Sequence, residues 1–129
     1  MSESIELVRA WKKKADQDLL AARVMLEHDA ELTEPIGFHA QQAVEKSLKG
    51  FLIYQGDIHL PKTHDVGNLL RLASHYEADL NDLEEVVELT PFAVEARYPE
   101  MDCAGVDAEE YLTIAERSCK IIWSYVEGL

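Results

Sequence analysis

This 129-residue sequence has no long apolar run and no CxxC motif. No stretch of about 18 uncharged apolar residues occurs, so we expect no membrane-spanning helix. The first residues, MSESIELVRAWKKK, lack an apolar signal core, so the expected location is the cytoplasm. Cys103 and Cys119 have no CxxC partner and are expected to be free thiols in a reducing compartment.

Positive charge is scarce too, because 12 Lys and Arg oppose 25 Asp and Glu, for a net charge of −13. This balance argues against general DNA binding, since phosphate binding needs a basic surface. Residues 1–64 carry 8 cations and 10 acids, whereas residues 65–129 carry 4 and 15. An anionic ligand should therefore favour the first half. Arg97 is the one cation within residues 72–116, which makes it a candidate for a specific role.

Alternating apolar and polar windows are absent as well, whereas apolar residues recur at helical spacing. The pattern predicts one all-α domain over residues 1–129. We expect an up-and-down antiparallel bundle of about five helices, four long and one short. The expected helices cover about residues 4–28, 33–55, 65–74, 80 to near 91, and 107–126.

Capping residues support these boundaries. Thr33 is expected to cap the second helix, with Pro35 in its first turn and Gly56 just after its end. Asp107 and Glu110 are expected to form a capping box for the last helix. The apolar arc of that last helix covers about half its circumference, which predicts packing on two sides, within the bundle or across a dimer.

Asp18 interrupts the apolar stripe of the first helix. A buried carboxylate without a partner costs several kcal/mol or becomes protonated, so we expect Asp18 to be paired rather than turned to water. The stripe consists of Leu7, Val8, Trp11, Ala15, Leu19, Ala22, Met25 and Leu26.

The second helix, which contains FHAQQAVEKSLKGFL, has a polar arc opposite its core face. Glu45 stands four residues before Lys49, the spacing of a helical ion pair. Two interpretations stay open: a solvated face with stray apolar residues, or a partly polar buried surface that meets a ligand or another subunit. The arc holds Phe38, His39, Gln42, Glu45, Lys46, Lys49 and Ile53.

The segment EARYPEMD forms a third candidate region. Pro99 favours an extended conformation for Tyr98 and ends any helix there. Arg97 could pair with Asp18 or Glu45, or hold a phosphate as a planar fork.

Three segments in this order, FHAQQAVEKSLKGFL, KTHDVGNLL and LTPFAVEARYP, resemble the HEPN domain family, and KADQDLLAARVML fits its first helix. The resemblance covers nearly the whole chain and implies a bundle of about five helices, usually a symmetric homodimer. Members are often encoded beside a minimal nucleotidyltransferase as a toxin–antitoxin-like pair. Some are ribonucleases, and others bind nucleotides or lack catalysis.

In the ribonuclease members of the family that this chain resembles, an Arg is followed, after four to six residues, by a His. If Arg97 is that Arg, the matching positions hold Asp102, Cys103 and Ala104, so the imidazole is missing. The resemblance therefore implies a dimeric nucleotide-binding, RNA-binding or toxin–antitoxin-type module without catalysis, and we expect no cofactor and no metal.

These arguments give one expected ligand site, in a groove near a subunit contact. Asp18 and Glu45 are expected to order its cations, and Arg97 is the catalytic candidate if the protein cleaves RNA. The expected ligand-binding residues are His39, Gln42, Lys46, Lys49, Arg97 and Tyr98.

Two alternative functions stay open. The first is a metal-independent endoribonuclease with a displaced base, for which His39, His64 or His75 could substitute in space. The second is a purely structural or interaction domain for a partner nucleotidyltransferase, in which acid–base pairs such as Asp18–Arg97 only fix the bundle.

Overall fold

The computed structural model describes residues 2–57, 62, 65–89 and 107–129, and the side chains of 5–57, 62, 65–83 and 107–129. This described part contains helices and no strand. The all-α fold expected from the sequence is therefore confirmed. The elements are α1 (Ser2–His28), α2 (Thr33–Tyr54), α3 (Val66–Ser74), the 3-10 helix η1 (Ala78–Leu89) and α5 (Ala108–Ser124).

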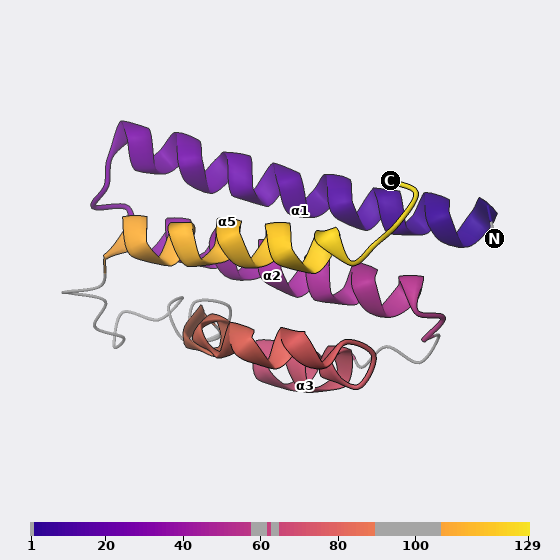
Figure 1. Cartoon of the computed structure of the whole chain (residues 1–129). Helices are drawn as coiled ribbons and strands as arrows, with labels where there is room; N and C mark the ends of the chain where they lie inside the picture. The colour runs from indigo at the N-terminus through magenta and orange to yellow at the C-terminus, as the bar shows by residue number, and fades with distance from the viewer. Residues whose placement is uncertain (1, 58–61, 63–64, 90–106) are drawn as a thin grey trace.

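The helix α2 lies at the centre of the bundle, where it contacts α1, α3, η1 and α5. Figure 1 shows α1 along one side of α2 and α5, with α3 and η1 on the other side. The helices α1 and α5 are antiparallel, because Arg9 donates a 2.8 Å hydrogen bond to the carbonyl of Gly128 while Arg23 pairs with Glu116. None of the described helices combines the length and apolarity needed to cross a membrane.

The end of α2 follows the sequence signal, but its start does not. Gly56 has a φ of +88°, and the amides of Gly56 and Asp57 donate to the carbonyls of Ile53 and Leu52, which closes the helix in a Schellman motif. The expected Thr33 cap was wrong. Leu32 is the N-cap, because Thr33 already belongs to the helix, and the hydrocarbon side chain of Leu32 cannot make a capping hydrogen bond.

The caps of α3 and α5 are carboxylates. The Asp65 side chain accepts a hydrogen bond from the amide of Asn68, and Asp107 accepts one from the amide of Glu110, each at 3.2 Å. The expected Asp107 cap is therefore confirmed, although α5 ends at Ser124, two residues earlier than the pattern indicated. The expected break near position 91 lies outside the described residues.

The core forms between α2 and its neighbours, and the stripe of α1 contributes to it as expected with one exception. Val8, Ala15 and Ala22 are buried, whereas Leu7 is half-exposed. Leu7 was wrongly expected to point inward, because it lies at the edge of the stripe, where the α1–α2 contact opens to solvent.

Glycine allows α2 and α5 to approach closely at one point. A Cβ built on Gly50 would lie 2.5 Å from the ring of Trp123 and 3.1 Å from the Cβ of Trp11. No side chain fits in that space without moving the indole. The nearby Trp123 donates a 2.8 Å hydrogen bond to the hydroxyl of Ser47, which in turn donates to the carbonyl of Ala43.

Candidate functional site

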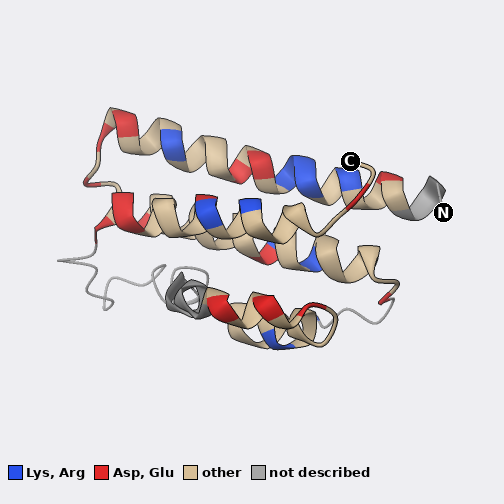
Figure 2. Cartoon of the chain, in the orientation of Figure 1, with Lys and Arg blue, Asp and Glu red and all other residues tan. Residues whose placement is uncertain are grey.

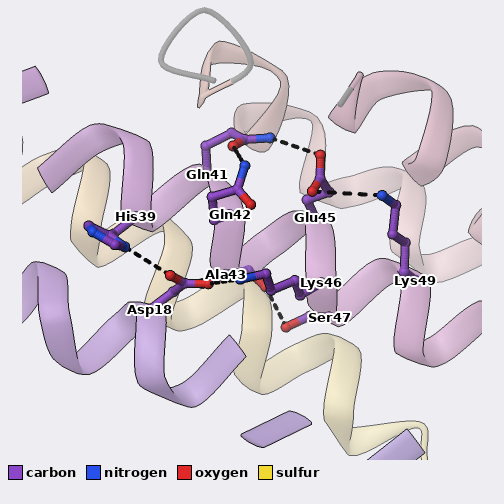
Figure 3. Close-up of polar contacts among 9 residues, drawn as sticks. All are labelled: Asp18, His39, Gln41, Gln42, Ala43, Glu45, Lys46, Ser47 and Lys49. Atoms are coloured by element: carbon purple, nitrogen blue, oxygen red, sulfur yellow. Dashed lines mark hydrogen bonds and ion pairs between the residues drawn. The ribbon is translucent and has the colours of Figure 1, made fainter. Parts of the chain in front are cut away.

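Asp18 lies on the side of α1 that faces α2, and only 8% of the residue is exposed. Its carboxylate joins two side chains of α2 (Figure 3). Oδ1 is 2.8 Å from Nδ1 of His39, and Oδ2 accepts a 2.6 Å hydrogen bond from the ammonium of Lys46. Asp18 is thus buried and paired, as its position in the apolar stripe led us to expect.

The spacing of His39 and Lys46 explains why one carboxylate reaches both. They are seven residues apart, almost two turns, so their side chains leave α2 on the same side. An ionised carboxylate only accepts hydrogen bonds, so a neutral His39 donates its Nδ1–H and keeps a lone pair on Nε2. Figure 3 shows this second nitrogen pointing away from Asp18, and the side chain is 28% exposed.

Orientation of the His39 ring has a second cause. The ring of Phe38 meets it edge-on, with centroids 5.6 Å apart and planes at 74°. Edge-to-face contacts of this kind stabilise a fixed ring position. The imidazole is therefore held by a carboxylate at Nδ1 and by an aromatic neighbour, while 28% of the side chain remains exposed.

A second polar cluster lies further round α2. Glu45 is 3% exposed, and its carboxylate is 3.7 Å from the ammonium of Lys49. The Gln41 amide approaches the same carboxylate at 3.5 Å, and Gln42 donates to Gln41 at 2.9 Å. The expected Glu45–Lys49 pair is confirmed. The ion pair and the amide contacts link these four side chains to one another.

Cys119 of α5 lies in the interior, close to Ser47. Burial raises the pKa of Cys119 to about 12, and a hydrogen bond with Ser47 lowers it by less. The thiol is therefore neutral at physiological pH and a poor nucleophile. Cys103 lies outside the described residues.

A groove of about 450 Å³ lies between α1 and Lys46 of α2. Lys46 contributes an ammonium that Asp18 holds, and Lys14 contributes a second from α1, one turn before Asp18. Trp11 provides an aromatic wall. The described lining residues are Leu7, Ala10, Trp11, Lys14 and Lys46.

The structure therefore divides the expected site residues. Lys46 lines the groove, whereas His39 does not line it and is linked to Lys46 through the shared Asp18. Gln42 and Lys49 belong instead to the Glu45 cluster. Arg97 and Tyr98 lie outside the described residues, as does any Asp18–Arg97 pair.

Sequence reasoning missed the contribution of α1 to the groove. Trp11 and Lys14 precede Asp18 by seven and four residues, which places all three along one edge of α1. That spacing was a usable signal. Gln41 was also missed, although it is fully buried, because it falls between the core face and the polar arc of α2.

The described side chains do not resemble a metal centre. Across residues 5–57, 62, 65–83 and 107–129, no group of three His, Cys, Asp or Glu residues is placed to hold an ion. The chemistry available in this part is a paired carboxylate, an oriented imidazole, two ammonium groups and an indole. Such a set suits an anionic ligand with an aromatic part.

Comparison with known proteins identifies the family. The HEPN domain model matches residues 8–126, and the chain belongs to this family. The candidate toxin MJ1304 of Methanocaldococcus jannaschii is 28% identical over 142 residues, which cover 96% of this chain and 91% of that protein. The crystal structure of ST0689, an archaeal HEPN homologue, is similar with a TM-score of 0.68 and 27% identity, over 91% of this chain and 95% of that one.

Proposed function

We propose that this HEPN protein is a nucleotide- or RNA-binding module of a toxin–antitoxin-type system, and that its ligand occupies the α1–α2 groove. One observation carries the proposal: Lys46 lines the groove while the buried Asp18 holds its ammonium in place. A held cation loses little side-chain entropy when an anion arrives, so it binds a phosphate more effectively than a mobile one.

The other groove residues complement a nucleotide. Trp11 offers an aromatic face on which a base can stack, and stacking contributes about 1–3 kcal/mol per base. Lys14 is exposed and forms no ion pair among the described residues, so its charge is available to a phosphate. The ligand would lie with its base against Trp11 and its phosphates between Lys14 and Lys46.

The charge of the groove depends on the shared carboxylate. Asp18 offsets the charge of Lys46, so the three-residue cluster is neutral when His39 is neutral and positive when His39 is protonated. Figure 2 shows Lys and Arg interspersed with Asp and Glu along α1, α2 and α5, whereas only acids occur among the charged residues of η1. Arg97 and Tyr98 are proposed to complete the site from the segment after η1.

Binding of RNA can be measured by the anisotropy of a dye-labelled single strand of about twelve nucleotides, and binding of ATP or GTP by calorimetry. Lys46→Gln and Lys14→Gln should each weaken binding roughly fivefold to tenfold, since each removes one phosphate contact. Lys120→Gln is the matched control, because it removes an exposed cation of α5 that does not line the groove. No saturable binding, or an equal loss in the control, would contradict the proposal.

A metal-independent endoribonuclease is the second candidate, and the His39–Asp18 contact favours it. A carboxylate at Nδ1 of an imidazole fixes the tautomer in which Nε2 can accept a proton. In this scheme Nε2 takes the proton of a ribose 2′-hydroxyl, the 2′ oxygen bonds to phosphorus, and the bond from phosphorus to the 5′ oxygen breaks, with a proton from water. Arg97 would stabilise the charged phosphate.

Gel analysis of end-labelled RNA distinguishes the two candidates. Cleavage predicts products with a 2′,3′-cyclic phosphate, lost in His39→Ala and in Arg97→Ala while both variants stay folded. A substrate with a single 2′-deoxy position should resist cleavage there. Intact RNA after long incubation with the wild-type protein would rule out cleavage, and binding would remain as the proposed function. Absence of both binding and cleavage would favour a domain that only contacts a partner such as a nucleotidyltransferase.

A further inference from the structure

The side of α1 opposite Asp18 carries two large apolar side chains. Leu20 is 64% exposed and Val24 is 56% exposed. They are four residues apart, so they are adjacent on the helix surface. Exposed apolar side chains that stand together, rather than singly, are typical of contact surfaces. The surroundings of this pair indicate what kind of molecule such a contact would involve.

Charged residues lead from Leu20 toward the N-terminal end of α1. Arg9, Lys13, Asp16 and Leu20 are separated by four, three and four positions, a spacing that keeps them on one side of a helix. Val24 continues the same line. We call these five residues the outer stripe of α1. Over about 22 Å the outer stripe changes from mostly basic to apolar.

The N-terminal part of the outer stripe borders a groove of about 550 Å³. Its other wall is the segment after α5, which returns to α1 (Figure 1). Arg9 donates a 2.8 Å hydrogen bond to the carbonyl of Gly128, and the half-exposed Leu129 lines the groove together with Lys13 and Leu20. Basic groups and apolar surface therefore meet in one open groove.

The groove has an excess of positive charge although the whole chain carries −13. Lys12 is compensated by Asp16 at 2.9 Å. Arg9 and Lys13 form no ion pair among the described side chains, and the bond from Arg9 to a carbonyl does not neutralise its charge. That bond also holds Arg9 in place, so it loses little freedom when an anion binds. The groove therefore favours a ligand with both acidic and apolar groups.

We propose that the groove and the outer stripe bind an acidic amphipathic helix of a partner protein. Acidic side chains of that helix contact Arg9 and Lys13. Its apolar side chains pack against Leu20, Val24 and Leu129. The spacing of the outer stripe favours a helical partner, because an amphipathic helix presents its own side chains at the same intervals of three and four positions.

Other occupants fit this surface less well. The described lining of the groove has no aromatic side chain on which a base could stack, unlike Trp11 in the α1–α2 groove. A nucleic acid would also leave Leu20 and Val24 uncovered. A second copy of this chain would bring a stripe that is itself basic and whose Asp16 is engaged by Lys12. Anionic lipids would be repelled by the net charge of −13.

The proposed partner site and the proposed ligand groove lie on different sides of α1. Trp11, Lys14 and Lys46 line the ligand groove, and none of them lines the groove beside Lys13 and Leu20. A partner helix on the outer stripe therefore leaves the ligand groove open, and the two sites can be tested separately.

A synthetic helical peptide tests the partner site. The probe is a dye-labelled, end-capped peptide of about sixteen residues, long enough to cover about 22 Å as a helix. Two Glu four positions apart precede two Leu four positions apart on the same side, and Ala and Gln fill the other positions. Its anisotropy should show saturable binding to the full chain. A peptide of the same composition with Glu and Leu on opposite sides should bind roughly tenfold more weakly.

Charge reversal tests the contacts. Lys13→Glu should weaken binding of the probe roughly tenfold, and Leu20→Ser roughly fivefold. A peptide with Lys in place of both Glu should bind the Arg9→Glu, Lys13→Glu double variant better than it binds wild type. Lys120→Glu is the matched control, because it reverses an exposed cation of α5 that does not line the groove. Circular dichroism confirms that each variant is folded.

The other occupants give different results. No saturable binding of the probe, or an equal loss in Lys120→Glu, would overturn the proposal. So would a chain that self-associates through Leu20 in sedimentation experiments and thereby excludes the peptide. A single-stranded RNA whose affinity falls with Lys13→Glu as much as that of the peptide would also overturn it. Unchanged RNA and nucleotide affinities in Lys13→Glu would leave the proposed function intact.

Discussion

The polar arc of α2 and the side of α1 that carries Leu20 and Val24 reverse the usual relation between residue type and burial. On α2, Glu45 is buried although it is charged, and Lys46 is held by Asp18. On α1, Leu20 and Val24 are exposed although they are apolar. The difference lies in the surroundings: the α2 side chains contact partners within the chain, whereas Leu20 and Val24 stay exposed in the part of the chain that the structure describes.

Two aspartates on α1 show the same contrast at short range. Asp18 has two partners from α2 and is almost fully buried, whereas the Asp16 side chain is 54% exposed and contacts Lys12 of its own helix. Two positions along a helix correspond to a rotation of about 200°, which turns one carboxylate inward and the other outward. Mutations at such pairs test whether the available partners decide which side chains are buried.

The largest effect is expected for Asp18→Ala. Removal of the carboxylate leaves the Lys46 ammonium and the His39 Nδ1–H without their acceptor in a mostly buried place, which should cost about 3 kcal/mol of unfolding free energy. Urea denaturation followed by circular dichroism measures it. Asp16→Ala is the control and should change stability by less than about 0.5 kcal/mol. Equal losses in the two variants would contradict the proposed difference.

Gly50→Ala tests the close approach of α2 and α5 at Gly50 and Trp123. The added methyl would meet the Trp123 ring at 2.5 Å, so the indole must shift and strain its bond to Ser47. We expect a loss of about 1–3 kcal/mol despite the better helix propensity of alanine. The same denaturation experiment checks this, and an alanine variant as stable as wild type would show that the interface can open at little cost.

Cys119 gives a pH-dependent test of the interior. Its pKa is raised from 9.0 to about 12 by burial, so above pH 9 the unfolded chain releases the thiol proton and the folded chain keeps it. The contribution of Cys119 to stability is therefore complete below pH 9 and is lost as pH rises from 9 toward 12. At pH 10 the loss should be on the order of 1 kcal/mol.

Thermal unfolding between pH 8 and 10.5 measures this slope. The Cys119→Ala variant serves as the reference, since its constant cavity cost does not alter the pH dependence. Parallel curves for wild type and variant would mean that the thiol titrates freely. Alkylation of Cys119 in the folded Cys103→Ser protein should also be much slower than in urea.

The smallest effect on the isolated chain is expected for Leu20→Ser. Its side chain mainly contacts solvent, so unfolding free energy at low protein concentration should change by less than about 0.5 kcal/mol. Leu48→Ser, at a fully buried position of α2, provides the contrast and should destabilise the fold severely. A large loss of unfolding free energy for Leu20→Ser in a monomer would show that Leu20 contacts another part of the same chain.

The sequence predicted the helices well because their signals are local. Spacing of apolar residues and the capping carboxylate Asp107 act within a few residues, and both appear in the structure. The exceptions are also local. Leu32 replaces Thr33 as the N-cap of α2, and η1 is a 3-10 helix with a non-helical Leu83, for which the apolar pattern gave no sign.

The site was predictable only in part, because it depends on how two helices are turned toward each other. The stripe of α1 correctly indicated that Asp18 is buried. Asp18 was also expected to order the cations of the site, but His39 and Lys46 were not singled out as its two partners. Those contacts require the axial register of α1 against α2, which no single helix specifies. For the same reason Trp11 and Lys14 were not recognised as neighbours of Lys46.

The two tryptophans of the chain lie in different surroundings, because Trp123 is hydrogen-bonded to Ser47 in the interior. Their fluorescence should therefore report different events. Trp123 is buried between helices, so its emission should stay at short wavelength and resist acrylamide until α5 leaves α2. Trp11 borders the α1–α2 groove and should be quenched by a bound base while the chain is still folded. Single Trp→Phe variants would assign the two signals, so occupancy of the groove and loss of the fold could be followed in one cuvette without a label.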